Sequence, residues 1–280
     1  MPDAAQPPLV MPGMTTPGTA SASADANVRI RVRDLTVAFG SFVLMRNVSF
    51  DVRVGDIFMV MGGSGCGKST LLRVLMGLKE PQQGQIAYNG EDFWTGTEES
   101  RSRIMRNTGV LFQGGALWSS MTLAENIALP LLHYTGLAPA VIDELIAFKL
   151  SLVGLAGFES FYPAQLSGGM RKRAALARAM ALDPDILFFD EPSAGLDPIS
   201  ARNLDELILE LRESLGATII IVTHELASIY AIGTNSVFLD SVSRTMLATG
   251  NPRALLAGCD NQVVINFLSR GTGNREVRSV

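Results

Sequence analysis

Residues 60–77, VMGGSGCGKSTLLRVLMG, join two apolar runs through a loop that is rich in glycine. The run before the loop, IFMVM at residues 57–61, is apolar throughout, which is typical of a parallel strand buried on both faces. The run after the loop repeats large apolar side chains at helical spacing: Leu71, Leu72, Leu75 and Met76. The stretch therefore predicts a strand, a glycine loop and a helix, in that order.

The loop itself, GGSGCGKS at residues 62–69, matches the phosphate-binding pattern G-x-x-x-x-G-K-[ST]. Backbone amides can surround a phosphate only where no side chain blocks the approach, and the helix N-terminus adds positive dipole. Lys68 would place its charge on the β- and γ-phosphates, and Ser69 would offer its hydroxyl to Mg²⁺. The pattern predicts ATP and Mg²⁺ as cofactors. The residues expected to bind ATP here are Gly62, Gly63, Ser64, Gly65, Cys66, Gly67, Lys68, Ser69 and Thr70.

A second strand pattern, ILFFDEP at residues 186–192, ends in two carboxylates, Asp190 and Glu191. Open α/β sheets bind their ligands at the carboxyl ends of the strands. Asp190 can hold Mg²⁺, directly or through water, and Glu191 is then placed to polarise an attacking water. A helix-capping pair after a core strand is the simpler alternative, but the phosphate loop earlier in the chain favours catalysis.

Composition narrows the class of protein. Of the 280 residues, 47% are hydrophobic and 18% are charged, which indicates a globular chain with one large core or two small ones. The net charge of −4 gives no reason to expect nucleic acid as a partner. Cys66 and Cys259 form no metal or disulfide framework, which fits a reducing compartment. No apolar run reaches the length needed to span a bilayer.

The organisation along the chain is that of an α/β protein. Residues 1–26, rich in Pro, Ala, Ser and Thr and without the features of a signal peptide, predict a disordered tail. Residues 28–39 and 48–54 alternate at period two and predict an antiparallel pair. Buried strands at residues 185–190 and 217–222 flank a helix that Gly216 ends, which makes a βαβ unit.

The middle of the chain has a different character. Thr122 and Glu125 have the spacing of a helix capping box, and Pro139 can open the next helix. Residues from about 115 to 165 therefore predict a helical subdomain inserted into the α/β core. The whole folded domain is expected over residues 27–270, with a C-terminal tail at residues 271–280.

The stretch QLSGGMRKRAALARAMALDPDILFFDEPSAGLDP, residues 165–198, resembles the signature helix, Walker B strand and D-loop of ABC-type ATPases. Gln113 in LFQGG resembles the Q-loop glutamine, a sensor of Mg²⁺ and water. His224 in IVTHE resembles the switch histidine that contacts the γ-phosphate. The resemblance covers residues 28–270. It implies an α/β P-loop ABC ATPase core with an N-terminal antiparallel β region and an inserted helical subdomain.

The resemblance also implies the roles of the site residues. Glu191, His224 and Gln113 would act in catalysis, and Ser69, Gln113 and Asp190 would contact the metal. Ser167 is expected to cap a helix that begins with Gly168 and Gly169, which makes a second anion site. The family uses this signature site in trans. A second copy of the chain is therefore expected to complete two composite ATP sites.

Two positions depart from the usual family pattern. Met170 stands where glutamine is commonest, which weakens the case for a polar contact with the ribose. Phe39 stands where tyrosine is usual and is the candidate to stack on adenine, although a strand-end aromatic residue can also belong to the core. The basic residues of MRKR, residues 170–173, are interpreted as a solvated helix face. Cys66 is expected to have a lowered thiol pKa at the helix N-terminus, unless it is only a variable loop position.

Within the family, the sequence favours transport. Repair and chromosome members carry long coiled-coil insertions, and translation members join two cassettes in one chain; neither feature is present. Residues 112–137 and 166–192 resemble the ATPases of Mla-type phospholipid-transport systems. That resemblance implies a membrane permease, an MCE-domain lipid-binding protein, a STAS-domain protein and a peripheral position on the cytoplasmic face of the bacterial inner membrane. The alternatives are a transporter of another hydrophobic solute and a non-transport regulatory ABC ATPase.

The segment after Gln113 is a candidate for the permease contact. Leu117, Trp118 and Met121 are three large apolar residues close together at the start of the expected helical subdomain. In ABC transporters this region forms a groove for a short cytoplasmic helix of the permease, and exposed apolar side chains would suit such a contact. The alternative is that these residues belong to the core.

Overall fold

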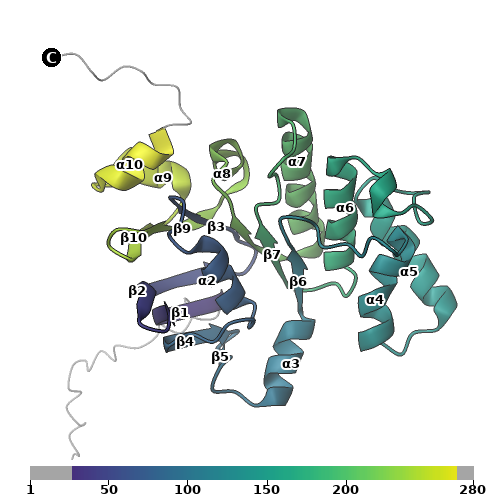
Figure 1. The fold of residues 1–280 in the computed structure, drawn as a ribbon, viewed down its shortest axis with the longest axis horizontal. Helices are drawn as coiled ribbons and strands as arrows, with labels where there is room; N and C mark the ends of the chain where they lie inside the picture. The colour runs from purple at the N-terminus through teal and green to yellow at the C-terminus, as the bar shows by residue number, and fades with distance from the viewer. Residues whose placement is uncertain (1–26, 270–280) are drawn as a thin grey trace, which may run out of the picture.

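The computed structural model describes residues 27–269, so both expected tails lie outside the described residues. Two sheets form the frame (Figure 1). The first is four-stranded, with the strand order β2-β1-β4-β5. Its strands are β1 (Val28–Phe39), β2 (Phe42–Arg53), β4 (Gln83–Tyr88) and β5 (Glu91–Asp92).

The second sheet is six-stranded, with the order β10-β9-β3-β8-β7-β6. Neighbouring strands from β9 to β6 run parallel, and β10 is antiparallel to β9. Its strands are β3 (Ile57–Gly62), β6 (Thr108–Leu111), β7 (Ile186–Asp190), β8 (Thr218–Val222), β9 (Asn235–Asp240) and β10 (Thr245–Thr249). The buried strands expected from the apolar runs are thus confirmed.

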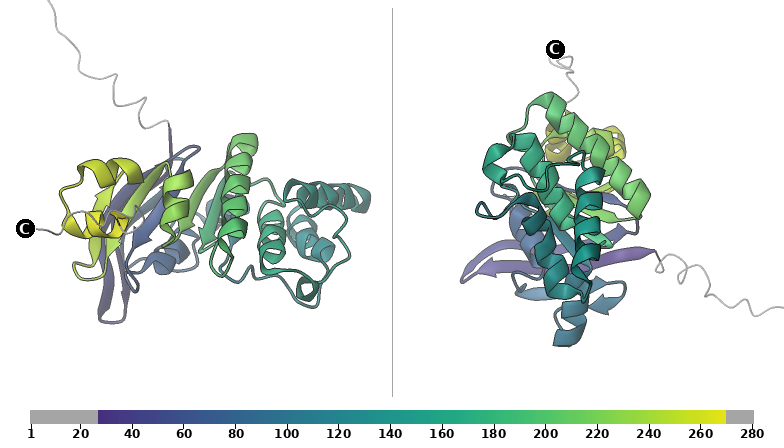
Figure 2. Two further views of the ribbon diagram at one scale, coloured as in Figure 1. Left: turned by 90° about the horizontal axis from the view of Figure 1, so that it is seen from above. Right: turned by 90° about the vertical axis from the view of Figure 1, so that its right-hand side faces the viewer.

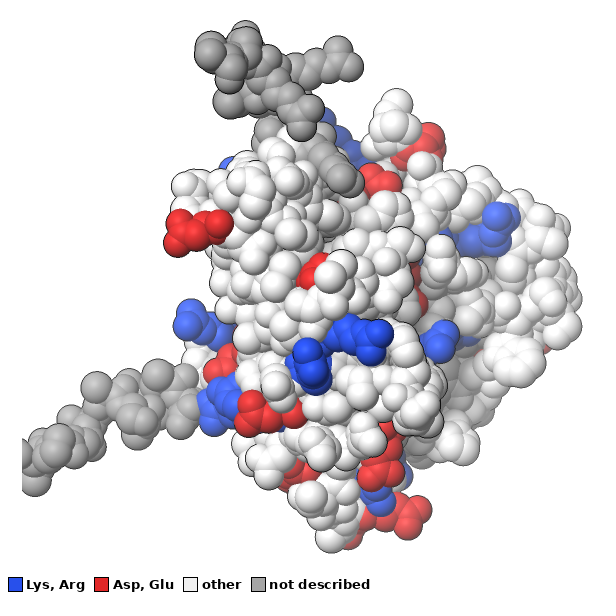
Figure 3. Space-filling view, turned by 60° about the vertical axis from the view of Figure 1, so that its left-hand side comes forward, with Lys and Arg blue, Asp and Glu red and all other residues white. Residues whose placement is uncertain are grey.

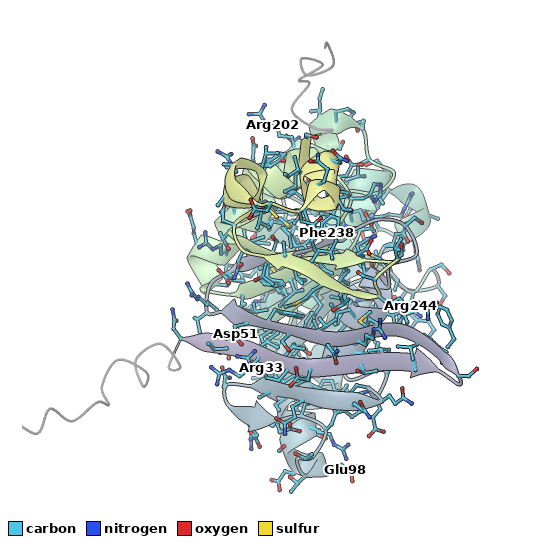
Figure 4. All side chains as sticks on the ribbon, turned by 90° about the vertical axis from the view of Figure 1, so that its left-hand side faces the viewer. Arg33, Asp51, Glu98, Arg202, Phe238 and Arg244 are labelled. Carbon is cyan, nitrogen blue, oxygen red and sulfur yellow. The ribbon has the colours of Figure 1, made fainter. Side chains whose placement is uncertain are left out.

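The antiparallel pair expected at the start of the chain is β1 with β2. An ion pair crosses the two strands, with Arg33 Nη1 2.8 Å from Asp51 Oδ1 (Figure 4). Both side chains are about a third exposed or more, so the pair contributes little to stability. Charges of both signs are intermixed on the face seen in Figure 3.

The central sheet separates two hydrophobic cores. On β3, Phe58 and Val60 pack with the antiparallel sheet and with helix α2 (Lys68–Leu75). Met59 and Met61 pack on the opposite face, against the helices of that side. Because β3 is buried on both faces, as its apolar run predicts, its carboxyl end is held between two packed layers.

The helix between β7 and β8 is α7 (Pro198–Leu215), and it completes the expected βαβ unit. Asp197 caps its N-terminus by accepting from the backbone N–H groups of Ile199 and Ser200 at 3.0 Å each. Gly216 ends it with a φ of 63°, which a glycine adopts without steric cost. The remaining helices on this side are α8 (Leu226–Ile232), α9 (Pro252–Gly258) and α10 (Gln262–Ser269).

Between β6 and β7 the chain is helical. It forms α4 (Leu123–Tyr134), α5 (Pro139–Leu152), a short 3₁₀ turn (Pro163–Gln165) and α6 (Gly168–Ala179). Figure 2 shows these helices gathered at one end of the molecule, away from the antiparallel sheet. The capping box of Thr122 and Glu125 is present, and Pro139 is the first residue of α5. Helix α3 (Glu98–Arg106) precedes β6. Over residues 27–269, no helix combines the length and apolar character that crossing a membrane requires.

One fully buried side chain, Asn126, fixes the loop that leads into α4. Its Oδ1 accepts from the N–H of Trp118 at 2.8 Å, and its Nδ2 lies 2.9–3.2 Å from the carbonyls of Trp118, Met121 and Thr122. An amide side chain is suited to this position because it donates and accepts at once. No local sequence pattern marks this residue.

We expect Asn126→Ala to lower the free energy of unfolding by about 3 kcal/mol, because buried peptide groups that lose their partners cost about 1–3 kcal/mol each. Thr122→Ala removes only the cap from the same helix and should cost about 1 kcal/mol. Urea denaturation of both variants measures the difference. A smaller loss for Asn126→Ala than for Thr122→Ala would contradict this role.

Candidate ATP site

The phosphate-binding loop leaves the central sheet at the carboxyl end of β3. Gly62, at the start of the loop, has a φ of 144°, and a Cβ there would lie 2.2 Å from the carbonyl oxygen of Leu239 in β9. The neighbouring strand therefore excludes any side chain. Gly67 precedes α2 with a φ of 99° and provides no side-chain cap, which leaves the first amides of the helix directed at the loop.

The Lys68 side chain contacts the backbone of the phosphate-binding loop. Its Nζ donates to the carbonyls of Gly62 and Gly63 at 3.0 Å each. These two hydrogen bonds hold the Lys68 ammonium against the backbone that would surround a phosphate. Gly63, Ser64 and Gly65 are exposed, so the amides at the tip of the loop are accessible.

The carboxylates of β7 meet this loop as the strand pattern predicts. Ser69 Oγ donates to Asp190 Oδ1 at 3.1 Å, which brings the two expected metal contacts together. No group of three or more His, Cys, Asp or Glu side chains suited to a metal occurs among residues 27–269. A hydroxyl, one carboxylate and phosphate oxygens are the hard oxygen ligands that Mg²⁺ prefers, so the residues present fit this ion.

Glu191 follows directly and pairs with His224. The His224 Nδ1 lies 2.8 Å from Glu191 Oε1, whereas Glu191 Oε2 is buried and has no hydrogen-bond partner within residues 27–269. Glu191 has a φ of 49°, an unusual backbone conformation for a residue with a side chain. Its N–H donates to the carbonyl of Val222 in β8 at 2.8 Å, so the sheet holds this turn in place.

Lys68, Glu191 and His224 share one cavity of about 530 Å³, whose lining does not include Ser69 or Asp190. It is lined by Gly62, Gly63, Ser64, Lys68, Glu191, His224, Leu226 and Phe267. Phe267 comes from α10 and packs edge-on against Phe238 of β9, with ring centroids 5.2 Å apart. Phe267 is not predictable from the sequence, because an apolar residue in a short C-terminal helix carries no signal of where that helix packs.

Other expected site residues lie apart from this cavity. Phe39 is half-exposed at the end of β1, and the Lys79 ammonium stands 4.2 Å from the centre of its ring. Gln113 is exposed and does not line the cavity. Ser167 caps α6 as expected, but it lines a separate cavity of about 430 Å³ with Gly169, Met170 and residues of α7.

The thiol of Cys66 corrects a sequence expectation. The residue is 2% exposed, and burial raises the pKa of its thiol despite the nearby charge of Lys68. Desolvation therefore outweighs the helix N-terminus and the lysine. The expected lowered pKa is wrong for this conformation, and Cys66 is a packing residue of the loop.

Lys172 corrects a second expectation, that of a solvated face over residues 170–173. Its side chain is buried, and its Nζ donates to the carbonyl of Gln113 and, at 3.4 Å, to the carbonyl of Glu191. Burial lowers the pKa of this ammonium, and the carboxylates of Glu191 and Asp190 oppose that shift. Arg171 is exposed and matches the expected solvated face.

A groove of about 330 Å³ lies between α3, β6 and α4. Its lining includes the exposed apolar side chains of Leu78, Met105, Phe112 and Tyr134. Trp118 is 60% exposed but does not line it, and Leu117 packs against the core. The two interpretations of this segment thus divide between neighbouring residues.

Comparisons with known proteins agree with this geometry. The family described as ABC transporter matches residues 45–194. The intermembrane phospholipid transport system ATP-binding protein MlaF of Haemophilus influenzae is 38% identical over 249 residues, which cover 89% of this chain and 93% of that protein. The probable ribonucleotide transport ATP-binding protein mkl of Mycobacterium leprae is 40% identical over 242 residues, covering 86% and 69%.

Solved structures give the same assignment. The dimeric structure of the bacterial ABC transporter cassette MJ0796 superposes with a TM-score of 0.71 at 27% identity, covering 79% of this chain and 98% of that one. A post-hydrolysis structure of the same cassette, bound to ADP and Pi, matches with a TM-score of 0.71 at 26% identity and the same coverage. The present chain belongs to the ABC transporter family, as one of its ATP-hydrolysing cassettes.

Proposed function

We propose that this chain hydrolyses ATP to power a membrane permease that moves phospholipid between the inner and outer membranes. The cargo is inferred from the 38% identity to the MlaF protein of Haemophilus influenzae over most of both chains. The observation that carries the catalytic part is the cavity shared by Lys68, Glu191 and His224, in which one carboxylate oxygen of Glu191 is buried and unpaired.

The residues divide the chemistry between them. The loop amides and Lys68 bind the phosphates, with Gly62 to Thr70 as the contact segment and Phe39 as the stacking partner of adenine. Ser69 and Asp190, which are in contact, would hold Mg²⁺, with Gln113 as a further proposed ligand, and the ion would neutralise charge on the phosphates. Glu191 accepts a proton from the attacking water, and His224 orients the Glu191 carboxylate through its 2.8 Å contact and senses the γ-phosphate.

The signature needs a partner. Ser167 and Gly169 line a different cavity from the phosphate-binding loop of the same chain. ABC cassettes form dimers, as the MJ0796 structure illustrates. We therefore propose that two copies of this chain sandwich two ATP molecules, each between the loop of one copy and the signature of the other.

The permease would dock at the groove lined by Met105, Phe112 and Tyr134, and the exposed Trp118 is a further candidate contact. Apolar side chains around a concave surface suit a short amphipathic helix. The remaining partners proposed are an MCE-domain lipid-binding protein and a STAS-domain protein, at the cytoplasmic face of the inner membrane. The helical subdomain expected at about residues 115–165 stays a prediction. In this proposal it is the part of the cassette that would move with the permease.

A second cargo class has its own support. The mkl protein of Mycobacterium leprae, named for ribonucleotide transport, is 40% identical to this chain. No described residue of the cassette distinguishes the two cargoes, because the lipid would contact the permease. Transport of another hydrophobic solute and a regulatory role without transport are the further alternatives.

The complex with its permease, purified from detergent-solubilised membranes and placed in proteoliposomes, tests the function. We expect ATP-dependent transfer of fluorescent phospholipid to acceptor vesicles. Transfer of ribonucleotide instead would replace the cargo assignment. A purified complex that hydrolyses ATP but transfers neither would contradict the transport proposal.

We expect Glu191→Gln to lower kcat by about a hundredfold or more, because a positioned general base contributes about 10²–10⁴. ATP binding should persist, since the amide has the same shape. Steady-state hydrolysis and equilibrium nucleotide binding, measured on the same preparation, separate the two effects. Turnover within a factor of about two of the parent would remove Glu191 from the role of base.

We expect Lys68→Ala to weaken ATP binding by roughly tenfold to a hundredfold, because it loses a charge-assisted contact with phosphate of about 1.5–3 kcal/mol. Titration with a fluorescent ATP analogue measures this loss. Arg202→Ala serves as the control, since it removes an exposed cation that pairs with Glu206 of α7, outside the ATP cavity. Unchanged affinity in Lys68→Ala would contradict its role.

We expect Phe112→Glu and Trp118→Glu each to weaken co-purification with the permease, because a carboxylate opposes an apolar contact. Both side chains are exposed, so the isolated variants should melt like the parent. Val242→Glu, on a side chain that is 89% exposed and outside the groove, is the matched control. A complex that forms and transports normally with both variants would rule out this surface.

A further inference from the structure

Two cations of the signature helix α6 contact the backbone of the Q-loop segment. Lys172 lies one turn into the helix, and its buried Nζ donates to the carbonyl of Gln113. Arg178 lies near the other end and donates through Nη1 to Ala116 at 2.6 Å and through Nη2 to Gly115 at 3.0 Å. Within four residues, three carbonyls of this segment are bonded to a single helix.

The backbone of the segment is shaped for these contacts. Gly115 and Ala116 both have positive φ, of 77° and 52°, and this left-handed pair turns their carbonyls toward Arg178. Ala116 pays a steric cost there that a glycine would avoid. A Cβ at Gly115 would lie 3.3 Å from the Cβ of Ala175, so the segment also packs closely on α6.

Lys172 makes one more contact, and it connects the segment to the main chain at the end of β7. The same Nζ lies 3.4 Å from the carbonyl of Glu191, the proposed general base. One ammonium therefore joins α6, the Q-loop and the end of β7. A buried ammonium has three donors and no acceptor, so its position is determined by the carbonyls that surround it.

We propose that Lys172, supported by Arg178, is a positioning residue that couples the two ATP sites of the dimer. Gln113 and Glu191 serve the ATP bound by their own chain, whereas the signature on α6 serves the ATP of the other copy. A shift of Gln113 or Glu191 on nucleotide binding is passed through Lys172 to α6. This inference rests on the two-copy sandwich proposed above.

A purely structural role of Lys172 would give different experimental results. If Lys172 only filled the core, its loss would lower stability and would leave the energetics of dimer closure unchanged. Lys149 provides the comparison, because it is the other buried lysine within residues 27–269 and pairs with Asp183, away from the ATP cavity. Lys149→Met and Lys172→Met each delete one buried ammonium at similar side-chain length.

The experiment measures Mg-ATP-driven dimerisation of the full chain in the Glu191→Gln background, by sedimentation velocity. We expect Lys172→Met to raise the dimer dissociation constant by about tenfold or more, the scale of one lost charge-assisted hydrogen bond. Nucleotide binding by the monomer should stay within about twofold. Lys172→Arg, which keeps the charge and donors, should restore dimerisation, and Lys149→Met should dimerise like the parent.

A second readout follows the Q-loop segment itself. The chain has two tryptophans, so Trp94→Phe leaves Trp118, five residues after Gln113, as the only one. We expect Mg-ATP to change Trp118 emission in the Trp94→Phe protein that keeps Lys172. Most of that change should be lost when Lys172→Met is added. An unchanged emission in the Lys172 protein would contradict transmission through this segment.

The outcomes separate the two proposals. A parent that binds Mg-ATP but remains monomeric contradicts the sandwich, and the coupling falls with it. A parent that dimerises, together with a Lys172→Met variant that dimerises equally well, contradicts the coupling alone. Equal losses in Lys172→Met and Lys149→Met would also overturn it, because they would indicate a general effect of a missing buried charge.

Discussion

The close approach of Gly62 to β9 is the constraint on which the ATP site depends. With only 2.2 Å between a Cβ there and the Leu239 carbonyl oxygen, only glycine fits where the chain leaves β3 on this path. That exit path sets the loop, the loop sets the start of α2, and α2 in turn packs between the two sheets. The geometry of the phosphate site is thus fixed by sheet packing rather than by contacts among its own side chains.

The four lysine side chains each contact a specific group. Four occur in the chain, and each has a defined partner: the loop carbonyls for Lys68, the Phe39 ring for Lys79, Asp183 for Lys149 and two main-chain carbonyls for Lys172. Two of these side chains are buried, and a buried ammonium is costly unless its donors are satisfied. Lys149 of α5 and Lys172 of α6 therefore each add a defined polar contact to the helical part of the protein.

Much of the fold could be predicted from short-range patterns. The strand at residues 57–61, the capping box at Thr122 and the helix end at Gly216 follow from side-chain chemistry within a few residues, and the structure confirms them. Lys172, Cys66 and Phe267 could not be placed in this way. Their environments depend on segments far away in the sequence, and periodicity says nothing about which distant backbone will cover a given side chain.

The same limit applies to the candidate site. The sequence pattern identifies the loop, Asp190 and Glu191 because each lies at or after the carboxyl end of a strand, where open α/β sheets bind ligands. His224 is identified only by the resemblance of IVTHE to ABC-type ATPases. The exposure of the apolar residues after Gln113 was harder to predict. Leu117 and Trp118 are adjacent and both apolar, yet Leu117 packs on the core and Trp118 is exposed, which an apolar pattern alone does not distinguish.

The left-handed turn at Ala116 has a consequence for engineering the protein. Ala116 and Glu191 both hold left-handed backbone conformations that favour glycine or asparagine, and both lie in segments proposed to bind or sense nucleotide. A search for thermostable variants would therefore be drawn to these positions, because relieving the strain raises stability. The gain would come from loosening the two turns that aim the carbonyls and the carboxylate, so durability and turnover are set against each other at the same two residues.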